Sequence, residues 1–216
     1  MLTRILLVIS TLSLAAFAQT PQIEPGVSQD LAKWRAAHYS DVRYKLNLTL
    51  EKMSPVLKGT MEIRVRVGEL GSWGVEETGT QAPSPANAGS SGVTNPQIIL
   101  DWRKIKGHEE KSTISNVELN GTKVQSASFS LSPPDASRAE ARTLSFSEHN
   151  EHLIFRDGVT PGENVIKLDF TSPILTSGSA ITRYVDKEDG AEHIYSLFVP
   201  SDASTAFPVF DQPDLK

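Results

Sequence analysis

The sequence predicts a mainly β protein, an antiparallel β-sandwich with one short N-terminal helix. Apolar and polar residues alternate in its longest segments, turn-forming residues separate many short apolar segments, and helical spacing is convincing in one short segment. Alternation of period two is typical of strands that bury one face. About nine such segments occur, and a chain of this kind packs as two antiparallel sheets.

The helix is the first expected element, and it follows residues 19–27, which we expect to form a flexible lead-in. Ser28 supplies an N-cap before the sequence QDLAKWRAAHY. Leu31 and Trp34 lie three residues apart, with Ala37 as the next candidate at the same spacing. These side chains should therefore share the buried face of the helix.

Two long strands are expected next, over residues 40–51 and 58–67. Apolar residues alternate with polar ones in both, and the turn-rich link EKMSPVLKG predicts that the strands pair as antiparallel neighbours. Residues 68–96 break this pattern, because Gly, Pro, Ser, Ala and Thr dominate them. This composition indicates a flexible insertion at a sheet edge.

Further short strands are expected after the insertion, each rich in β-branched or aromatic residues. The pair Asn120-Gly121 predicts a hairpin with a type I′ turn, because both residues tolerate positive φ. A second loop is expected over residues 132–142. The expected strand segments are QIILDW, TISNVEL, TKVQSASF, HLIF, ENVIKLDF, SAITRYV and HIYSLFV.

Residues 1–18 predict an exported protein. Arg4 precedes an apolar run that ends on Ala16-Phe17-Ala18, which has the small-x-small pattern of a signal-peptidase site. The run is shorter than the ~20 apolar residues that span a bilayer. We therefore expect cleavage after residue 18, no membrane association afterwards, and a periplasmic or extracellular location, with a retained anchor as the alternative.

The composition excludes several classes of function. The net charge is −5 and Lys and Arg are scattered, so nucleic acid is not an expected partner. The chain has no Cys, which excludes disulfides, thiolate metal sites and a Cys nucleophile. No Gly-x-Ser-x-Gly elbow and no Gly-rich phosphate loop occur in the sequence.

Histidines give two weak candidates for a metal site. The segment from His108-Glu109 begins like H-E-x-x-H, but Ser112 stands where the second His is needed, so we expect a solvated loop. His149 and His152 are three residues apart and would face opposite sides of a strand. We expect an exposed loop His and a strand-start His there. The residues therefore predict no catalytic site, metal site or cofactor in this chain.

The most specific motif lies at the end of the chain, in the sequence AFPVFDQPDLK. The segment 182–216, together with residues 26–51 and the strand PGENVIKLDF, resembles the N-terminal domain of the aminopeptidase N family. This family comprises the zinc-dependent membrane alanyl aminopeptidases and their leukotriene-hydrolase relatives. The resemblance implies a saddle-like β-sandwich over residues 28–216. The residues that match the family's Phe-Pro-x-Phe-Asp-x-Pro-Asp pattern are Phe207, Pro208, Phe210, Asp211, Pro213 and Asp214.

The resemblance also implies how this domain would work. In relatives a thermolysin-like domain follows, with Gly-x-Met-Glu-Asn for the substrate's amino terminus and H-E-x-x-H-x18-E for zinc, and neither motif occurs here. We expect the chain to be inactive alone. The expected partner is the zinc-binding catalytic domain of the same enzyme, and a peptide substrate is expected only in the intact enzyme.

One substrate-binding loop of the family falls inside this domain. Relatives carry a Gln-x-Glu pattern that holds the substrate's α-ammonium group, and the aligned residues here are Leu197 and Val199. Neither side chain can accept a hydrogen bond. Either the catalytic domain alone binds the ammonium, or substrates are recognised differently, or Leu197 and Val199 simply face the core.

Two other interpretations stay open. A free-standing secreted β-sandwich that binds peptide or carbohydrate would have no large apolar patch where the terminal motif ends. The aminopeptidase interpretation predicts an exposed apolar face near Phe207 and Phe210. The third interpretation is that the stop at Lys216 is an artefact of a truncated gene.

Overall fold

A computed structural model gives the fold of most of the chain. The predicted signal peptide at 1–18, the predicted loop at 132–142 and all but the two end residues of the predicted insertion lie outside the described residues. Within the described part, no helix is both long and apolar enough to cross a bilayer. The described ranges are 20–68, 96–126 and 144–215.

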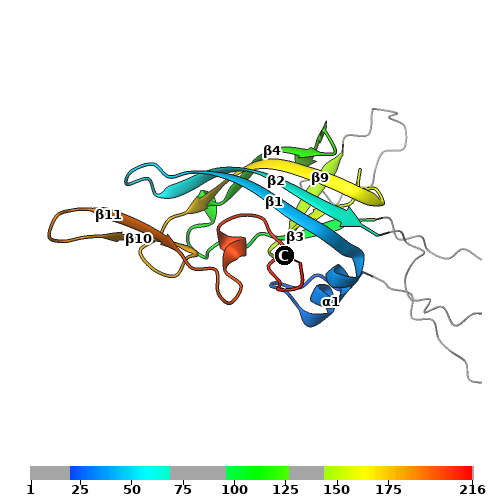
Figure 1. The fold of residues 1–216 in the computed structure, drawn as a ribbon, viewed down its shortest axis with the longest axis horizontal. Coiled ribbons are helices and arrows are strands. Elements are labelled where there is room, and N and C mark those ends of the chain that lie inside the picture. The colour runs from blue at the N-terminus through cyan, green and yellow to red at the C-terminus, as the bar shows by residue number, and fades with distance from the viewer. Residues whose placement is uncertain (1–19, 69–95, 127–143, 216) are drawn as a thin grey trace, which may run out of the picture.

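The predicted fold class is confirmed, because one short helix precedes a succession of strands that form facing sheets (Figure 1). The elements in chain order are α1 (Gln29–His38), β1 (Tyr39–Thr49), β2 (Val56–Val67), β3 (Ile98–Asp101), the 3-10 helix η1 (Glu109–Lys111), β4 (Thr113–Leu119), β5 (Thr122–Lys123), β6 (Gln125–Ser126), β7 (Ser145–His149), β8 (His152–Phe155), β9 (Gly162–Pro173), β10 (Ile181–Val185), β11 (Glu192–Ser196) and the 3-10 helix η2 (Ala203–Thr205).

Three sheets share these strands. A five-stranded sheet has the order β1-β2-β9-β4-β5, and a four-stranded sheet has the order β3-β8-β7-β6. Neighbours are antiparallel, as predicted, except for the two-residue parallel pair of β6 and β7. Strands β10 and β11 form a separate hairpin that projects from one end of the molecule (Figure 1).

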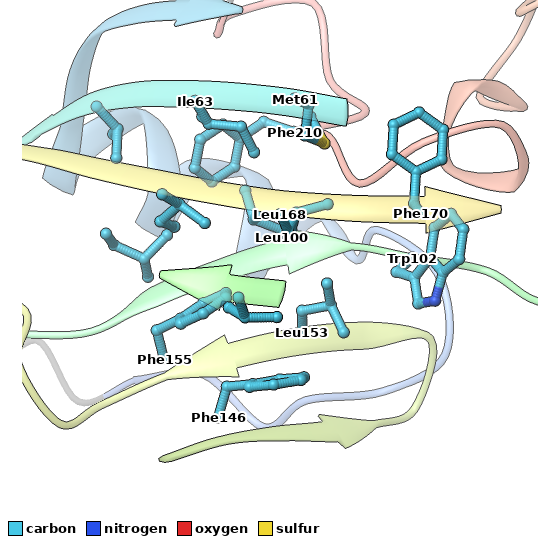
Figure 2. Close-up of a cluster of buried hydrophobic side chains, with 14 of the residues drawn as sticks. Met61, Ile63, Leu100, Trp102, Phe146, Leu153, Phe155, Leu168, Phe170 and Phe210 are labelled. Carbon is cyan, nitrogen blue, oxygen red and sulfur yellow. The ribbon is translucent and has the colours of Figure 1, made fainter. Parts of the chain in front are cut away.

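The main core fills the space between the two larger sheets (Figure 2). Met61 and Ile63 of β2 lie at alternate positions and are buried, which is the outcome that period-two alternation predicts. Gly59 continues this series, and a Cβ there would lie 2.3 Å from the Phe170 ring, so only glycine leaves room for that ring. The other core side chains labelled in Figure 2 are Leu100, Trp102, Phe146, Leu153, Phe155, Leu168 and Phe210.

Helix α1 covers the outer face of the four-stranded sheet. Its N-cap is the predicted one, since the Leu31 N–H donates to Ser28 Oγ at 3.2 Å. Leu31 packs with Ile99 of β3 and Ile154 of β8, which explains why those two strands are buried on both faces. The predicted buried face was wrong at one position: Ala37 is exposed, and Arg35 is buried instead.

Two features differ from the strand predictions. The alternation in β1 suggested a half-buried strand throughout, yet Leu48 is exposed at its far end. The tip of the β1–β2 hairpin lies on the side of β10 and β11 rather than over β3 (Figure 1). Strand β7 was not predicted, whereas the type I′ hairpin at Asn120-Gly121 is confirmed, with φ values of 52° and 80°.

Candidate functional site

The terminal motif lies along the free edge of β3, close to β1 and α1 (Figure 1). Val209 pairs with Asp101 of β3 through two backbone hydrogen bonds, of 2.7 and 3.1 Å. Phe210 is only 2% exposed, and its ring lies 5.1 Å from the ring of Tyr39. Phe207 is half-buried against Phe198. The side chains of Phe207 and Phe210 therefore do not themselves form an exposed apolar face, because they pack against their own domain.

The remaining motif residues divide between core and surface. Pro208 is buried, whereas Pro213 and Asp214 are exposed. Gln212 is buried, and its Nε2 donates to the carbonyl oxygen of Ala32 in α1 at 3.1 Å. The motif thus holds the first helix against the last described residues of the chain.

A buried polar cluster, formed by Arg35, Asp101, His152 and Asp211, fixes the motif in place. Arg35 donates to both carboxylate oxygens of Asp101, at 2.8 and 2.7 Å, and its side chain is fully buried. The Asp211 N–H donates to Asp101 Oδ2 at 2.8 Å. Asp101 therefore connects helix α1, strand β3 and the terminal motif through hydrogen bonds to a single carboxylate.

His152 adds an imidazole ring to this cluster. Its Nδ1 bonds the carbonyl oxygen of Asn150, which can only accept, so this nitrogen carries a hydrogen. Its Nε2 lies 3.1 Å from Asp101 Oδ1. His152 thus connects the turn between β7 and β8 to Asp101.

The pKa values of the two carboxyl groups in the cluster, Asp101 and Asp211, are shifted in opposite directions. Burial alone would raise the pKa of Asp101, but His152, Arg35 and the Asp211 N–H together hold that pKa below its ordinary value. Burial raises the pKa of Asp211, and the nearby Asp101 charge adds to this, against the hydrogen bonds from Ser204. The surroundings of Asp101 therefore favour its ionised form, whereas those of Asp211 disfavour ionisation.

A small cavity of about 120 Å³ adjoins this cluster. It is comparable in volume to a few water molecules, at about 30 Å³ each, and is too small for a peptide. The oxygens of Asp101 already face Arg35, His152 and a backbone N–H, so this carboxylate is not available as a general base. The lining residues are Gly26, Val27, Asp101, Arg103, Glu151, Ser201, Ser204 and Asp211.

The histidine predictions need one correction. His149 and His152 are cross-strand partners on either side of a two-residue turn, where Asn150 and Glu151 have φ values of 47° and 66°. They therefore sit opposite each other in a hairpin, rather than on opposite sides of one strand, and His149 ends β7 instead of lying in a loop. Within the described ranges, no three His, Asp or Glu side chains are placed to hold a metal ion.

The loop after β11 is exposed. Leu197 and Val199 are 59% and 72% exposed, while Phe198 between them turns inward toward the core. The alternative that Leu197 and Val199 face the core is therefore wrong. Sequence alternation alone could not settle this, because either face of this segment carries apolar residues.

Comparisons with known proteins show which proteins this chain resembles. No family model matches the chain. Aminopeptidase N of Streptomyces lividans is 34% identical over 59 residues, which are 27% of this chain and 7% of that enzyme. The solved structure of yeast LTA4 hydrolase in complex with bestatin matches with a TM-score of 0.50 and 14% identity, over 83% of this chain and 22% of the hydrolase.

A second structure, native leukotriene A4 hydrolase from Saccharomyces cerevisiae, matches over the same shares of the two chains with a TM-score of 0.49 and 13% identity. The chain thus spans a small part of the length of these proteins. The sequence match and the shared fold support an N-terminal domain of the aminopeptidase N family.

The two predicted functional segments have different environments. The terminal motif is built into the core through the Asp101 cluster, and Leu197 and Val199 are presented to solvent. The sequence did contain a signal for the cluster: Asp101 directly follows the apolar run Ile98–Leu100, and Arg35 lies one helical turn after Leu31.

Proposed function

We propose that this chain acts as the non-catalytic N-terminal domain of an exported zinc metallo-aminopeptidase, which removes N-terminal amino acids from peptides. The domain would support the catalytic domain and form one side of its substrate cleft. The catalytic domain of the same enzyme would supply zinc and the reacting groups. The observation that carries this proposal is the 34% identity over 59 residues to Streptomyces lividans Aminopeptidase N, and the fold shared with yeast LTA4 hydrolase accompanies it.

The geometry of the last described segment is consistent with this role. Residues 203–210 are held in the core, whereas Leu197 and Val199 are exposed just before them. A catalytic domain packed beside this loop would cover apolar side chains without disturbing the core. The proposed export to the periplasm or the extracellular space rests on the predicted signal peptide at 1–18.

A chimaera tests the proposal. Residues 19–216 would replace the N-terminal domain of the Streptomyces lividans enzyme, and hydrolysis of alanine p-nitroanilide and zinc content would be measured. We expect the chimaera to bind zinc and retain most of the parent's activity, and we expect the same enzyme without an N-terminal domain to be inactive. A folded, zinc-loaded chimaera that is as inactive as the deletion would contradict the proposal. Hydrolysis by the isolated chain would contradict its non-catalytic role.

The same chimaera tests the loop. Introducing Leu197→Gln and Val199→Glu supplies the acceptors that relatives carry, so KM for peptides should fall more than kcat changes. Leu48→Gln is the matched control, because Leu48 is similarly exposed but lies on β1. An equal effect of both changes would argue against a substrate-facing loop.

A secreted β-sandwich that binds peptides is the second candidate function. The observation that favours it is a row of exposed aromatic and apolar side chains on the β10–β11 hairpin, including Tyr184 and Tyr195.

A further inference from the structure

We propose that the outer edge of β11 binds an extended, basic peptide segment by strand addition. The peptide's apolar side chains would lie against an exposed apolar stripe, defined as Tyr184, His193, Tyr195 and Leu197, and its basic residues beside the acidic turn between β10 and β11. This property goes beyond the proposed role as a supporting domain, because it requires only the residues of this hairpin.

The backbone of β11 presents an unpaired edge. Leu197 N–H donates to the Ala180 carbonyl and Asp186 N–H to the Ala191 carbonyl, each at 2.8 Å. Hydrogen-bonded pairs alternate in an antiparallel ladder, so these two bonds fix the direction of every backbone group between them. The residues of β11 whose backbone N–H and C=O groups point away from β10 are Glu192, Ile194 and Ser196.

These outward groups have no backbone partner among the described residues, where β11 pairs with β10 alone. The opposite edge of the hairpin is already occupied. Arg183 N–H of β10 donates to the Leu175 carbonyl at 2.7 Å, and Leu175 N–H donates to the Ile181 carbonyl at 3.3 Å. An added strand can therefore pair with β11 and not with β10. An exposed edge of this kind is the structure to which extended peptides add.

The two faces of the hairpin are not equivalent. On one face Arg183 Nε donates to Glu192 at 2.6 Å, and Glu192 accepts the Met53 N–H from the β1–β2 turn at 3.0 Å. The apolar stripe occupies the other face, because Tyr184 is the register partner of His193. The Tyr184 and His193 rings stack at 6.2 Å.

This second face is open to solvent. Tyr184 and Tyr195 are 52% and 56% exposed, and Leu197 continues the stripe with 59% exposure. Alternate side chains of a strand added at the edge would fall beside these residues. Cross-strand aromatic and β-branched pairs are the contacts that stabilise such pairing.

The charge of the turn selects the partner. Asp186, Glu188 and Asp189 supply three carboxylates against the single cation of Lys187. No ion pair within the described ranges neutralises these three carboxylates. Asp186 accepts the Glu188 N–H at 2.7 Å and Asp189 accepts the Ala191 N–H at 2.8 Å, so both carboxylates are held at the turn. Basic side chains complement this end of the hairpin, and polyanions are repelled from it.

The test uses the whole chain and one probe, the labelled peptide acetyl-Lys-Lys-Val-Thr-Val-Thr-Val-amide, with fluorescence anisotropy as the readout. Ser196→Pro removes an outward N–H at an edge position where proline is tolerated, and Ser196→Ala is the matched control that keeps this N–H. We expect Ser196→Pro to weaken binding at least about fivefold, the equivalent of one lost hydrogen bond. Ser196→Ala should leave binding unchanged. Backbone amide spectra of both variants check that the hairpin is intact.

Changes to the peptide or to the buffer test the two other parts of the proposal, which are the charge attraction at the turn and the backbone pairing at the edge. Replacing both lysines with glutamate, or raising the salt concentration, should weaken binding, because either change reduces the attraction between the peptide and the acidic turn. Methylating alternate backbone nitrogens should abolish it. Equal binding by both Ser196 variants, equal binding by the methylated peptide, or no binding at millimolar peptide overturns the proposal.

Binding of a different ligand at the β11 edge would also overturn the proposal. Binding of an uncharged oligosaccharide but not the peptide would assign the stripe to carbohydrate. A dimer that Ser196→Pro converts to monomer would assign the edge to a second copy of the chain. Because this assay uses the chain alone, its failure leaves the aminopeptidase proposal intact. Failure of the chimaera likewise leaves peptide binding at β11 intact.

Discussion

Replacing Asp101 with Asn should remove a large share of the domain's stability. The change keeps the shape of the side chain but leaves the fully buried guanidinium of Arg35 without its counter-charge. Breaking a buried pair by removing one partner costs about 3–5 kcal/mol. The whole stability of a domain is about 5–15 kcal/mol. The variant should therefore fold only marginally.

Urea unfolding followed by tryptophan fluorescence measures this loss. With an m-value of about 2 kcal/mol per molar urea, the midpoint should fall by roughly 1.5–2.5 M. Asp202→Asn is the control, because the Arg103–Asp202 pair is 38% and 41% exposed and such pairs contribute about 0–1 kcal/mol. Equal midpoints for the two variants would refute the argument from burial.

The pH dependence gives a second check on the same residue. Although burial opposes it, contacts with His152, Arg35 and the Asp211 N–H hold the pKa of Asp101 below its ordinary value. A carboxyl group with a lowered folded-state pKa stabilises the protein above its unfolded pKa of about 3.9, and this contribution is lost as pH falls through the folded pKa. The difference in stability between the natural chain and Asp101→Asn should therefore be largest near neutral pH and shrink in acid.

Three further changes test other parts of the core. Asp211→Asn should leave stability unchanged or slightly higher at neutral pH, because burial and a neighbouring carboxylate raise the pKa of Asp211, and thermal melts in acid should show no difference. Gly59→Ala should cost about 1–3 kcal/mol, because the new Cβ meets the Phe170 ring, and adding Phe170→Leu should restore part of the urea midpoint. Tyr44→Phe should cost about 1–2 kcal/mol in the same assay, because the Phe210 N–H loses its acceptor at 2.9 Å.

The sequence predicted the parts of the fold that depend on neighbouring residues. The Ser28 cap, the alternation in β2 and the turn at Asn120-Gly121 each follow from a few adjacent side chains. The hairpin at Asn150-Glu151 was missed because it contains no glycine, although both residues adopt positive φ. Its turn conformation is fixed by pairing between β7 and β8, which local preferences do not encode.

The Asp101 cluster could not be predicted in full for a related reason. Arg35, Asp101, His152 and Asp211 come from four segments, and only the packing of α1, β3, β8 and the terminal motif brings them together. Composition and spacing indicated that Phe210 needed a surface to bury against. They did not indicate that this surface belongs to the same domain.

The burial of the terminal motif narrows where any partner can bind. Phe210 is committed to the core and the Asp211 N–H to Asp101, whereas the stripe and the loop after it present apolar side chains to solvent. Leu197 belongs to both, and the supporting role and the peptide-binding role therefore share one side chain. Leu197→Ser should weaken peptide binding at β11, and any loss of activity that it causes in the chimaera would show that the catalytic domain contacts this side chain, whereas Ser196→Pro should impair peptide binding alone. If Ser196→Pro instead impaired the chimaera as well, the edge of β11 would be part of the contact with the catalytic domain.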